Sequence, residues 1–114
     1  MLATETARRA PDIIEGITRL ASGESDSAGV EEIRVEIHGL KGAASVVGAT
    51  RLAELAQAIE VTLVERTAPG TLPPETASAL IEATEALRDG ARATSRGEPE
   101  PASVAASLAA LARP

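Results

Sequence analysis

The sequence predicts an all-α fold, an up-down antiparallel four-helix bundle with an additional C-terminal helix. Three observations lead to this prediction. Apolar residues recur at spacings of three and four in five segments, which is the period of an amphipathic helix. Short stretches rich in Gly, Pro and Ser separate these segments. The apolar residues make up 44% of the chain without any aromatic residue, and this composition disfavours β-sheet.

The five predicted helices cover residues 3–21, 29–47, 50–66, 73–95 and 102–112, and we expect one domain spanning residues 1–114. Short connections between the first four segments predict that consecutive helices are antiparallel neighbours. The fifth segment follows a polar, proline-containing linker. We expect it either to cap the bundle or to begin a connection to another domain.

The first two helices are predicted from their apolar stripes. Pro11 is expected to start a fresh turn of the first helix or to kink it, and Gly48 is expected to stop the second helix. The stripe of the first helix consists of Ile13, Ile14, Ile17 and Leu20, and that of the second consists of Val30, Ile33, Ile37, Leu40, Ala44 and Val47.

The last three helices are predicted from start signals and stripes together. Thr50 is the expected N-cap of the third helix, and Pro73 and Pro74 open the fourth, since proline is favoured in a first turn. The stripes consist of Leu52, Leu55, Ala56, Ile59 and Leu63 in the third helix, of Ala77, Leu80, Ile81, Thr84 and Leu87 in the fourth, and of Val104, Leu108 and Leu111 in the fifth.

The net charge of −6 disfavours nucleic acid and anionic membrane surfaces as partners, because both attract a basic surface. No aromatic side chain is present on which a nucleobase could stack. The absence of cysteine excludes disulfides, thiolate metal sites and a cysteine nucleophile. No apolar run reaches the roughly 18 residues of a membrane span, and the N-terminal residues lack the apolar centre of a signal peptide. We therefore expect a cytoplasmic protein without a metal site.

The single histidine of the chain, His38, is the first candidate for chemistry. On a helical wheel of about 100° per residue, the stripe of the second helix clusters within about 60° of Ile33, and His38 lies at about 140°. His38 is therefore predicted on an exposed flank, with Arg34, Lys41 and Ser45 on the same side. A neutral imidazole nitrogen is a competent nucleophile toward phosphorus, and an ammonium group is an ordinary partner of a phosphate.

Gly42, one turn beyond His38, leaves bare backbone on the exposed side, so that another surface can approach the imidazole. The third helix has a matching flank with Gln57, Glu60 and Val64. If the two helices pack antiparallel, Gln57 and Glu60 reach the neighbourhood of His38, and a carboxylate there would fix the protonated ring nitrogen. The residues alone also allow a purely structural interpretation, in which His38 is a solvated or capping side chain.

The run from 38 to 44, His-Gly-Leu-Lys-Gly-Ala-Ala, resembles the signature His-x-Leu-Lys-Gly-(Ala/Ser) of histidine-containing phosphotransfer (HPt) domains. The resemblance continues through Gly48-Ala49, Leu52, Leu55 and the pair Ile59-Glu60, and in detail it covers about residues 33–60. It implies a four-helix bundle, often with an extra helix, that carries a phosphoryl group on a histidine.

The resemblance also implies roles for single residues. His38 matches the phosphoacceptor, Lys41 the lysine that stabilises the phosphoryl group, and Gly42 the glycine that makes room for the partner. Gln57 and Glu60 match positions near the histidine in the amino-terminal P1 domain of chemotaxis-type histidine kinases, where the glutamate orients the imidazole.

Three further residues on the two flanks are expected to contact the partner: Arg34, where the family often has a basic residue, Ser45 and Val64. The chain also departs from the family pattern. Gly39 replaces the usual Ser or Thr, Ile37 replaces a small residue, and Gln57 stands where chemotaxis kinases often have a second histidine. These departures leave the phosphoacceptor in place and leave the subtype and the partner's identity open.

The predicted function is that of a phosphocarrier in a two-component phosphorelay. A histidine kinase catalytic domain or a phosphorylated receiver would deliver the phosphoryl group, and the aspartate of a response-regulator receiver domain would accept it. The chain would need no cofactor of its own, with Mg²⁺ on the receiver and ATP on the kinase, and it would not be an enzyme. The alternatives are a helical docking module that transfers nothing and, less consistent with the sequence, an enzyme with His38 as general base.

Overall fold

The computed structural model describes residues 2–24, 27–67 and 72–112. They form five α-helices: α1 (Leu2–Ala21), α2 (Ser27–Val46), α3 (Thr50–Arg66), α4 (Pro74–Ser95) and α5 (Ala102–Leu111). No β-strand occurs in these three stretches of chain. The all-α prediction is confirmed, and each predicted boundary lies within about two residues of the observed one, as is usual for helix ends. Parts of the predicted loops, at 25–26 and 68–71, lie outside the described residues.

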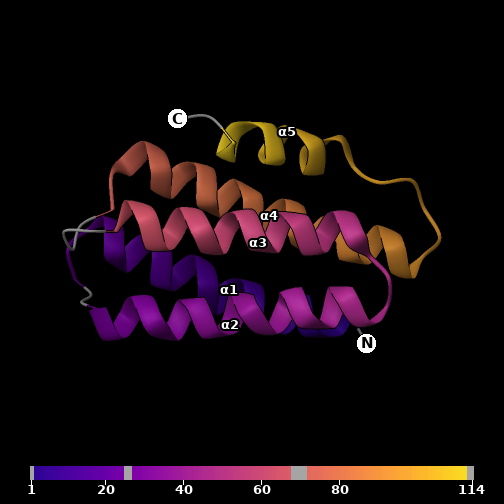
Figure 1. Ribbon diagram of the computed structural model, residues 1–114, viewed down its shortest axis with the longest axis horizontal. Coiled ribbons are helices and arrows are strands. Elements are labelled where there is room, and N and C mark those ends of the chain that lie inside the picture. Colours follow the sequence, from indigo (N-terminus) through magenta and orange to yellow (C-terminus); the bar gives the residue numbers. More distant parts are fainter. Residues whose placement is uncertain (1, 25–26, 68–71, 113–114) are drawn as a thin grey trace.

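The first four helices form an up-down bundle in which each helix packs on the next and α1 closes against α4 (Figure 1). The fifth helix lies on α3 and α4, so it caps the bundle on the side away from α2. Among the described helices, none combines the length and apolarity that a membrane crossing requires.

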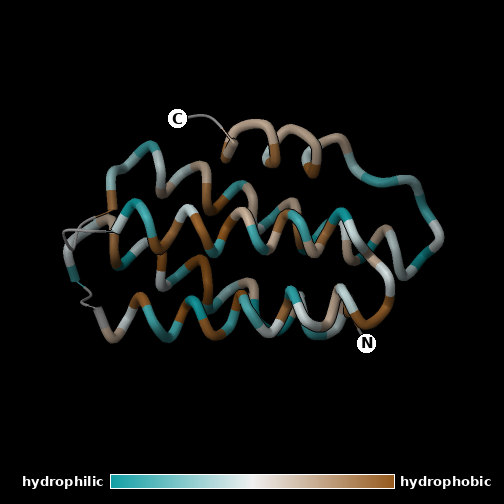
Figure 2. The backbone as a smooth tube through the Cα atoms, in the orientation of Figure 1, coloured by the Kyte–Doolittle hydropathy of each residue, from teal (hydrophilic) through white to brown (hydrophobic). Residues whose placement is uncertain are grey.

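The hydrophobic core cluster consists of aliphatic side chains, because the chain has no aromatic residue. Thr6, Thr67, Thr84 and Ser107 are buried as well. Apolar residues recur about once per turn along each helix (Figure 2), and the predicted stripes supply most of the buried side chains. The largest fully buried side chains are Ile13, Ile17, Leu20, Ile37, Leu40, Leu55, Ile59, Leu63, Leu72, Leu80, Leu87 and Val104.

Two helical glycines permit close packing between helices. A Cβ atom on Gly16 would lie 2.7 Å from the side chain of Ile33 on α2. A Cβ atom on Gly90 would lie 2.6 Å from Leu52 on α3 and 3.2 Å from Val104 on α5. Gly90 therefore lets α3 and α5 approach the backbone of α4.

The turn between α2 and α3 corrects two expectations. Gly48 adopts a φ of +75°, which confirms it as the stop after α2. Val47, assigned to the buried stripe, lies beyond the last residue of α2 and is 56% exposed, because the helical period no longer applies where the helix has ended. Thr50 is the first residue of α3 and not its N-cap; that position belongs to Ala49, which has no capping side chain.

The prolines behave as helix-start and helix-interior residues. Pro73 and Pro74 stand at the N-cap and at the beginning of α4, as predicted. Pro11 lies inside α1, which runs without interruption from Leu2 to Ala21. Its side chain is exposed, so the ring lies on the solvent side of the bundle and does not enter the core.

Candidate functional site

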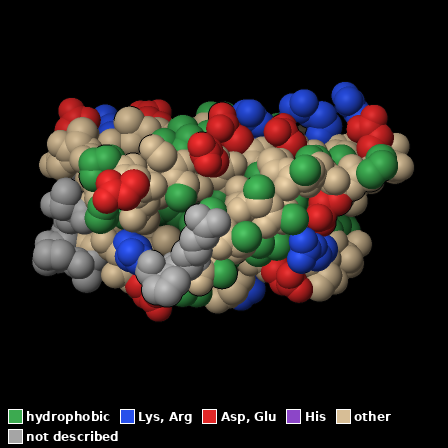
Figure 3. All heavy atoms as spheres, turned by 90° about the horizontal axis from the view of Figure 1, so that it is seen from above, with side chains coloured by type: hydrophobic (Ala, Val, Ile, Leu, Met, Phe, Trp, Pro, Cys, Tyr) green, Lys and Arg blue, Asp and Glu red, His purple; other side chains and the backbone are tan. Residues whose placement is uncertain are grey.

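The site is built on the flank shared by α2 and α3. Burial of Ile37 and Leu40 fixes the rotation of α2, and this rotation leaves the intervening His38 in solvent, with 62% of its side chain exposed. His38 Nδ1 lies 3.5 Å from Oε1 of Glu60 on α3. This distance confirms the predicted meeting of the two flanks for His38 and Glu60. The view from the side of α5 shows no histidine on that face (Figure 3).

Glu60 is shared between His38 and Arg34. Its side chain is only 14% exposed, and its second oxygen, Oε2, accepts a hydrogen bond of 3.1 Å from Nη1 of Arg34. Arg34 also donates to Glu31, one turn earlier on α2. Hydrogen bonds to Glu31 and then to Glu60 raise the pKa of Arg34, and the bond from Arg34 lowers the pKa of Glu31. The three side chains thus form a continuous ionic chain that ends at the imidazole.

Lys41 and Gln57 form a second link across the two helices. The Lys41 ammonium donates to the side-chain oxygen of Gln57. Both residues were predicted on the facing flanks, and the structure joins them directly. The link holds one positive charge on the same flank as His38, one turn along α2.

The two glycines that follow His38 lie in different surroundings. A Cβ atom on Gly42 would meet no atom of the described residues within 4 Å, which agrees with open space beside the imidazole. A Cβ atom on Gly39 would come within 3.2 Å of Nη1 of Arg9 on α1. Gly39 therefore faces α1, and α2 continues through both glycines.

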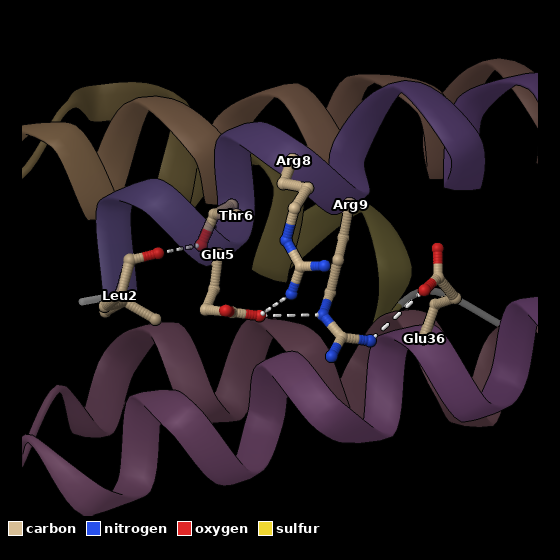
Figure 4. A network of polar contacts seen from close by, with 6 residues as sticks. All are labelled: Leu2, Glu5, Thr6, Arg8, Arg9 and Glu36. Atoms are coloured by element: carbon tan, nitrogen blue, oxygen red, sulfur yellow. Dashed lines mark hydrogen bonds and ion pairs between the residues drawn. The ribbon is translucent and has the colours of Figure 1, made fainter.

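The arginine beside Gly39 belongs to a separate ionic network between α1 and α2. Arg9 donates to Glu5 on its own helix at 3.1 Å and to Glu36 on α2 at 3.2 Å (Figure 4). Arg8 donates to the same oxygen of Glu5 at 2.7 Å. Hydrogen bonds from Arg8 and Arg9 lower the pKa of Glu5. This network lies on the other side of α2 and does not include Glu60.

A shallow hollow adjoins the imidazole, and its lining adds two residues that the sequence did not single out, Val61 and Glu65. Val61 and Val64 are 39% and 48% exposed at its edge, with Glu65 beside them. Val61 follows Gln57 by four residues and precedes Val64 by three, so the helical spacing alone could have found it. Ser45 is exposed but is not part of the lining. The remaining lining residues are His38, Lys41, Gln57 and Glu60.

A wider groove between α1 and α2 offers different chemistry. Its lining includes five carboxylates and one arginine, so an anionic phosphoryl group would be repelled there. Within the described residues, no group of three or more His, Cys, Asp or Glu side chains is arranged to hold a metal ion. The hollow beside His38 is therefore the candidate site, because it places a nucleophilic nitrogen next to an ammonium group. The groove residues are Asp12, Glu15, Arg19, Glu31, Glu32 and Glu36.

Comparison with known protein families supports the same region. The family model of the Hpt domain matches residues 2–90, which include α1, α2, α3 and most of α4. Comparison with curated proteins and with solved structures gives no significant match. The match covers more than three quarters of the 114 residues and contains the whole candidate site. The chain therefore belongs to the Hpt domain family, whose members are the histidine phosphotransfer modules of phosphorelays and carry phosphoryl groups rather than acting as catalysts.

Proposed function

We propose that His38 accepts a phosphoryl group on Nε2 and passes it to the aspartate of a response-regulator receiver domain. The observation that carries this proposal is the exposed imidazole whose Nδ1 faces the Glu60 carboxylate at 3.5 Å. A carboxylate at this nitrogen favours a proton on Nδ1, which leaves the lone pair on Nε2. Nε2 is then the nucleophile, and it belongs to a side chain that is largely in solvent.

The transfer exchanges one bond to phosphorus for another. The Nε2 lone pair attacks phosphorus while the bond to the donor oxygen breaks, and that oxygen leaves with ADP or stays on a receiver aspartate. In the second step, from His38 to the receiver, the N–P bond breaks and the receiver's aspartate forms the new O–P bond. Such transfers depend chiefly on positioning and on charge stabilisation, which suits a histidine held on a regular helix.

Lys41 and Gly42 have separate roles in this scheme. The Lys41 ammonium stabilises the negative charge on the transferred group, and its bond to Gln57 limits how far it moves from the imidazole. Gly42 leaves open space beside the helix, where the active site of a partner approaches the phosphorus.

The proposed partners are a receiver domain and the catalytic domain of a histidine kinase. Both would dock over the α2–α3 flank, with Val64 as an apolar contact and with Arg34 and Ser45 at its edge. The receiver would supply Mg²⁺ and the kinase would supply ATP. Because ATP is needed upstream, we expect the chain to act in the cytoplasm.

The second candidate is a docking module that binds a receiver or a kinase without transferring a phosphoryl group. It requires only the shape of the α2–α3 flank. The presence of His38, Lys41 and Gly42 together favours transfer, since a pure docking surface has no need of a nucleophile.

The decisive experiment is phosphorylation of the wild-type chain and of His38→Gln by a phosphorylated receiver, and by a kinase core with ATP. We expect an acid-labile, base-stable label on the wild type only. Circular dichroism of both proteins should be the same, because His38 lies outside the core. Unlabelled wild type, with donors that label another Hpt domain in the same assay, would favour the docking module.

A further inference from the structure

The Glu60 carboxylate has two different neighbours, one on each oxygen. Oε1 lies 3.5 Å from His38 Nδ1, and Oε2 accepts a 3.1 Å hydrogen bond from Arg34 Nη1. With its side chain 14% exposed, Glu60 has little access to water that could replace either neighbour. The orientation of the carboxylate, and so the position of the oxygen that faces the imidazole, depends on Arg34.

Arg34 is itself held from the opposite side. Its Nε and Nη2 donate to the two oxygens of Glu31 at 2.8 and 2.6 Å, a paired arrangement that fixes the plane of the guanidinium. The remaining terminal nitrogen, Nη1, then points to Glu60. Only a guanidinium group can bind two carboxylates in this way, because its donors stand in a rigid fork.

We propose that Arg34 is a positioning residue that sets the tautomer of His38 through Glu60. Free histidine prefers its proton on Nε2, which would block the nitrogen that the proposed function requires. A fixed carboxylate 3.5 Å from Nδ1 reverses this preference, because its negative charge stabilises the proton on Nδ1. The hydrogen bond from Arg34 keeps that carboxylate in place. The tautomer part of this inference stands on geometry alone, and its consequence for phosphorylation rests on the proposed function.

The inference gives Arg34 a second role, in addition to the partner contact proposed for it. Its guanidinium is directed at two carboxylates of its own chain, and its side chain is 34% exposed. It is also distinct from Lys41, whose ammonium is bound to Gln57 and has no bond to Glu60. Loss of Arg34 would leave Glu60 without its hydrogen-bond donor in a site of low exposure, where the carboxylate would turn away from Nδ1.

The chain provides a matched control for this proposal. Arg9 also bridges two carboxylates, Glu5 and Glu36, joins two helices and has a side-chain exposure of 27%, close to that of Arg34. Its network does not reach Glu60 (Figure 4). Arg9→Gln and Arg34→Gln therefore remove similar interactions, and only the second touches the carboxylate beside His38.

The first measurement is the tautomer of His38, read from its ring nitrogens by two-bond ¹H–¹⁵N correlation NMR in the full chain. We expect mostly Nδ1–H in the wild type and in Arg9→Gln, and a clear shift toward Nε2–H in Arg34→Gln. Arg34→Lys should be intermediate, because one ammonium keeps a charge near Glu60 but cannot also bind Glu31. A wild-type tautomer in Arg34→Gln, or an equal shift in Arg9→Gln, would overturn the inference.

The second measurement is the rate of His38 labelling by a phosphorylated receiver, together with the ring nitrogen that carries the phosphorus. We expect Arg34→Gln to label about fivefold more slowly, the effect of one hydrogen bond, with part of the label moved to Nδ1. Slower labelling with an unchanged tautomer and unchanged attachment would refute the positioning role. If the wild type takes no label, the proposed function fails, and the tautomer measurement still decides this inference.

Discussion

At the scale of single residues, the helical glycines show which positions serve the fold and which do not. Glycine inside a helix costs about 1 kcal/mol relative to alanine. Gly16 and Gly90 have a structural reason for this cost, because side chains of other helices occupy the space that a Cβ atom would take. Gly42 has no such neighbour among the described residues. The loss of helix stability at Gly42 is therefore consistent with a partner that needs this space, and packing within the bundle does not explain it.

We predict opposite effects of alanine at these positions. Gly42→Ala should stabilise the protein by about 0.5–1 kcal/mol, because the methyl group meets no atom and the helix gains propensity. Gly90→Ala should destabilise it by about 1–3 kcal/mol, because Leu52 must move. Urea unfolding followed by circular dichroism measures both free energies. Destabilisation by Gly42→Ala would show that an atom of the protein does occupy that space.

A larger side chain at the same position tests the clearance argument. Gly42→Glu should fold as the wild type does, because its side chain extends into open space. It should also slow phosphoryl transfer from a receiver at least tenfold, about 1.4 kcal/mol in the barrier, by filling the approach and adding a negative charge. The comparison is made by labelling time courses of the wild type and of Gly42→Glu. A rate equal to that of the wild type would remove the clearance role of Gly42.

At the scale of elements, the helices could be predicted because their signals are local. A stripe such as Ile33, Ile37 and Leu40 identifies the buried face of α2 without knowledge of any other helix. The error at Val47 arose because spacing alone does not say where a helix ends, and here the turn at Gly48 ends it one residue earlier.

The links between helices could be predicted only in part. The wheels of α2 and α3 placed Glu60 near His38 once an antiparallel pair was assumed. The helical wheels could not show that Arg34 binds the same carboxylate. This contact depends on the register of α3 along α2 and on the two hydrogen bonds from Arg34 to Glu31. For the same reason the sequence did not predict that the Arg9 side chain lies beside Gly39. Contacts of long side chains between helices are set by tertiary packing, which a single-helix pattern does not contain.

The fifth helix allows a prediction that separates stability from function. Val104 of α5 is fully buried, next to Gly90 of α4. Val104→Ala should lower the free energy of unfolding by about 1–3 kcal/mol through lost apolar burial and a small cavity. Labelling of His38 should stay at the wild-type rate in the folded variant, since α5 packs on α3 and α4 and not on α2. A reduced rate would indicate that α5 takes part in the phosphotransfer surface.

At the scale of the whole molecule, ion pairs between arginines and glutamates make the stability of the folded state depend on pH. Arginine hydrogen bonds hold the pKa values of Glu5 and Glu31 below the ordinary value for glutamate. A lowered pKa in the folded state contributes stability above about pH 4.3, the pKa in an unfolded chain. This contribution is lost as the pH falls through the folded-state pKa values.

The double variant Glu5→Gln/Glu31→Gln tests this dependence. At neutral pH its thermal midpoint should lie below that of the wild type, and the difference should shrink as the pH falls below about 4.3. Added salt should reduce the difference at neutral pH, because Glu5 is partly exposed and Glu31 is exposed to solvent. A difference that stays constant from neutral to acid pH would show that the charges of these two residues are not its cause.

The aliphatic core of the bundle also determines how the protein can be observed. Because the chain has no tryptophan or tyrosine, it has no indole or phenol chromophore and is nearly transparent in the near ultraviolet. In a mixture with a receiver domain, all tyrosine and tryptophan fluorescence would come from the receiver. A change in that emission on mixing would report complex formation without a dye, a tag or a correction for the carrier.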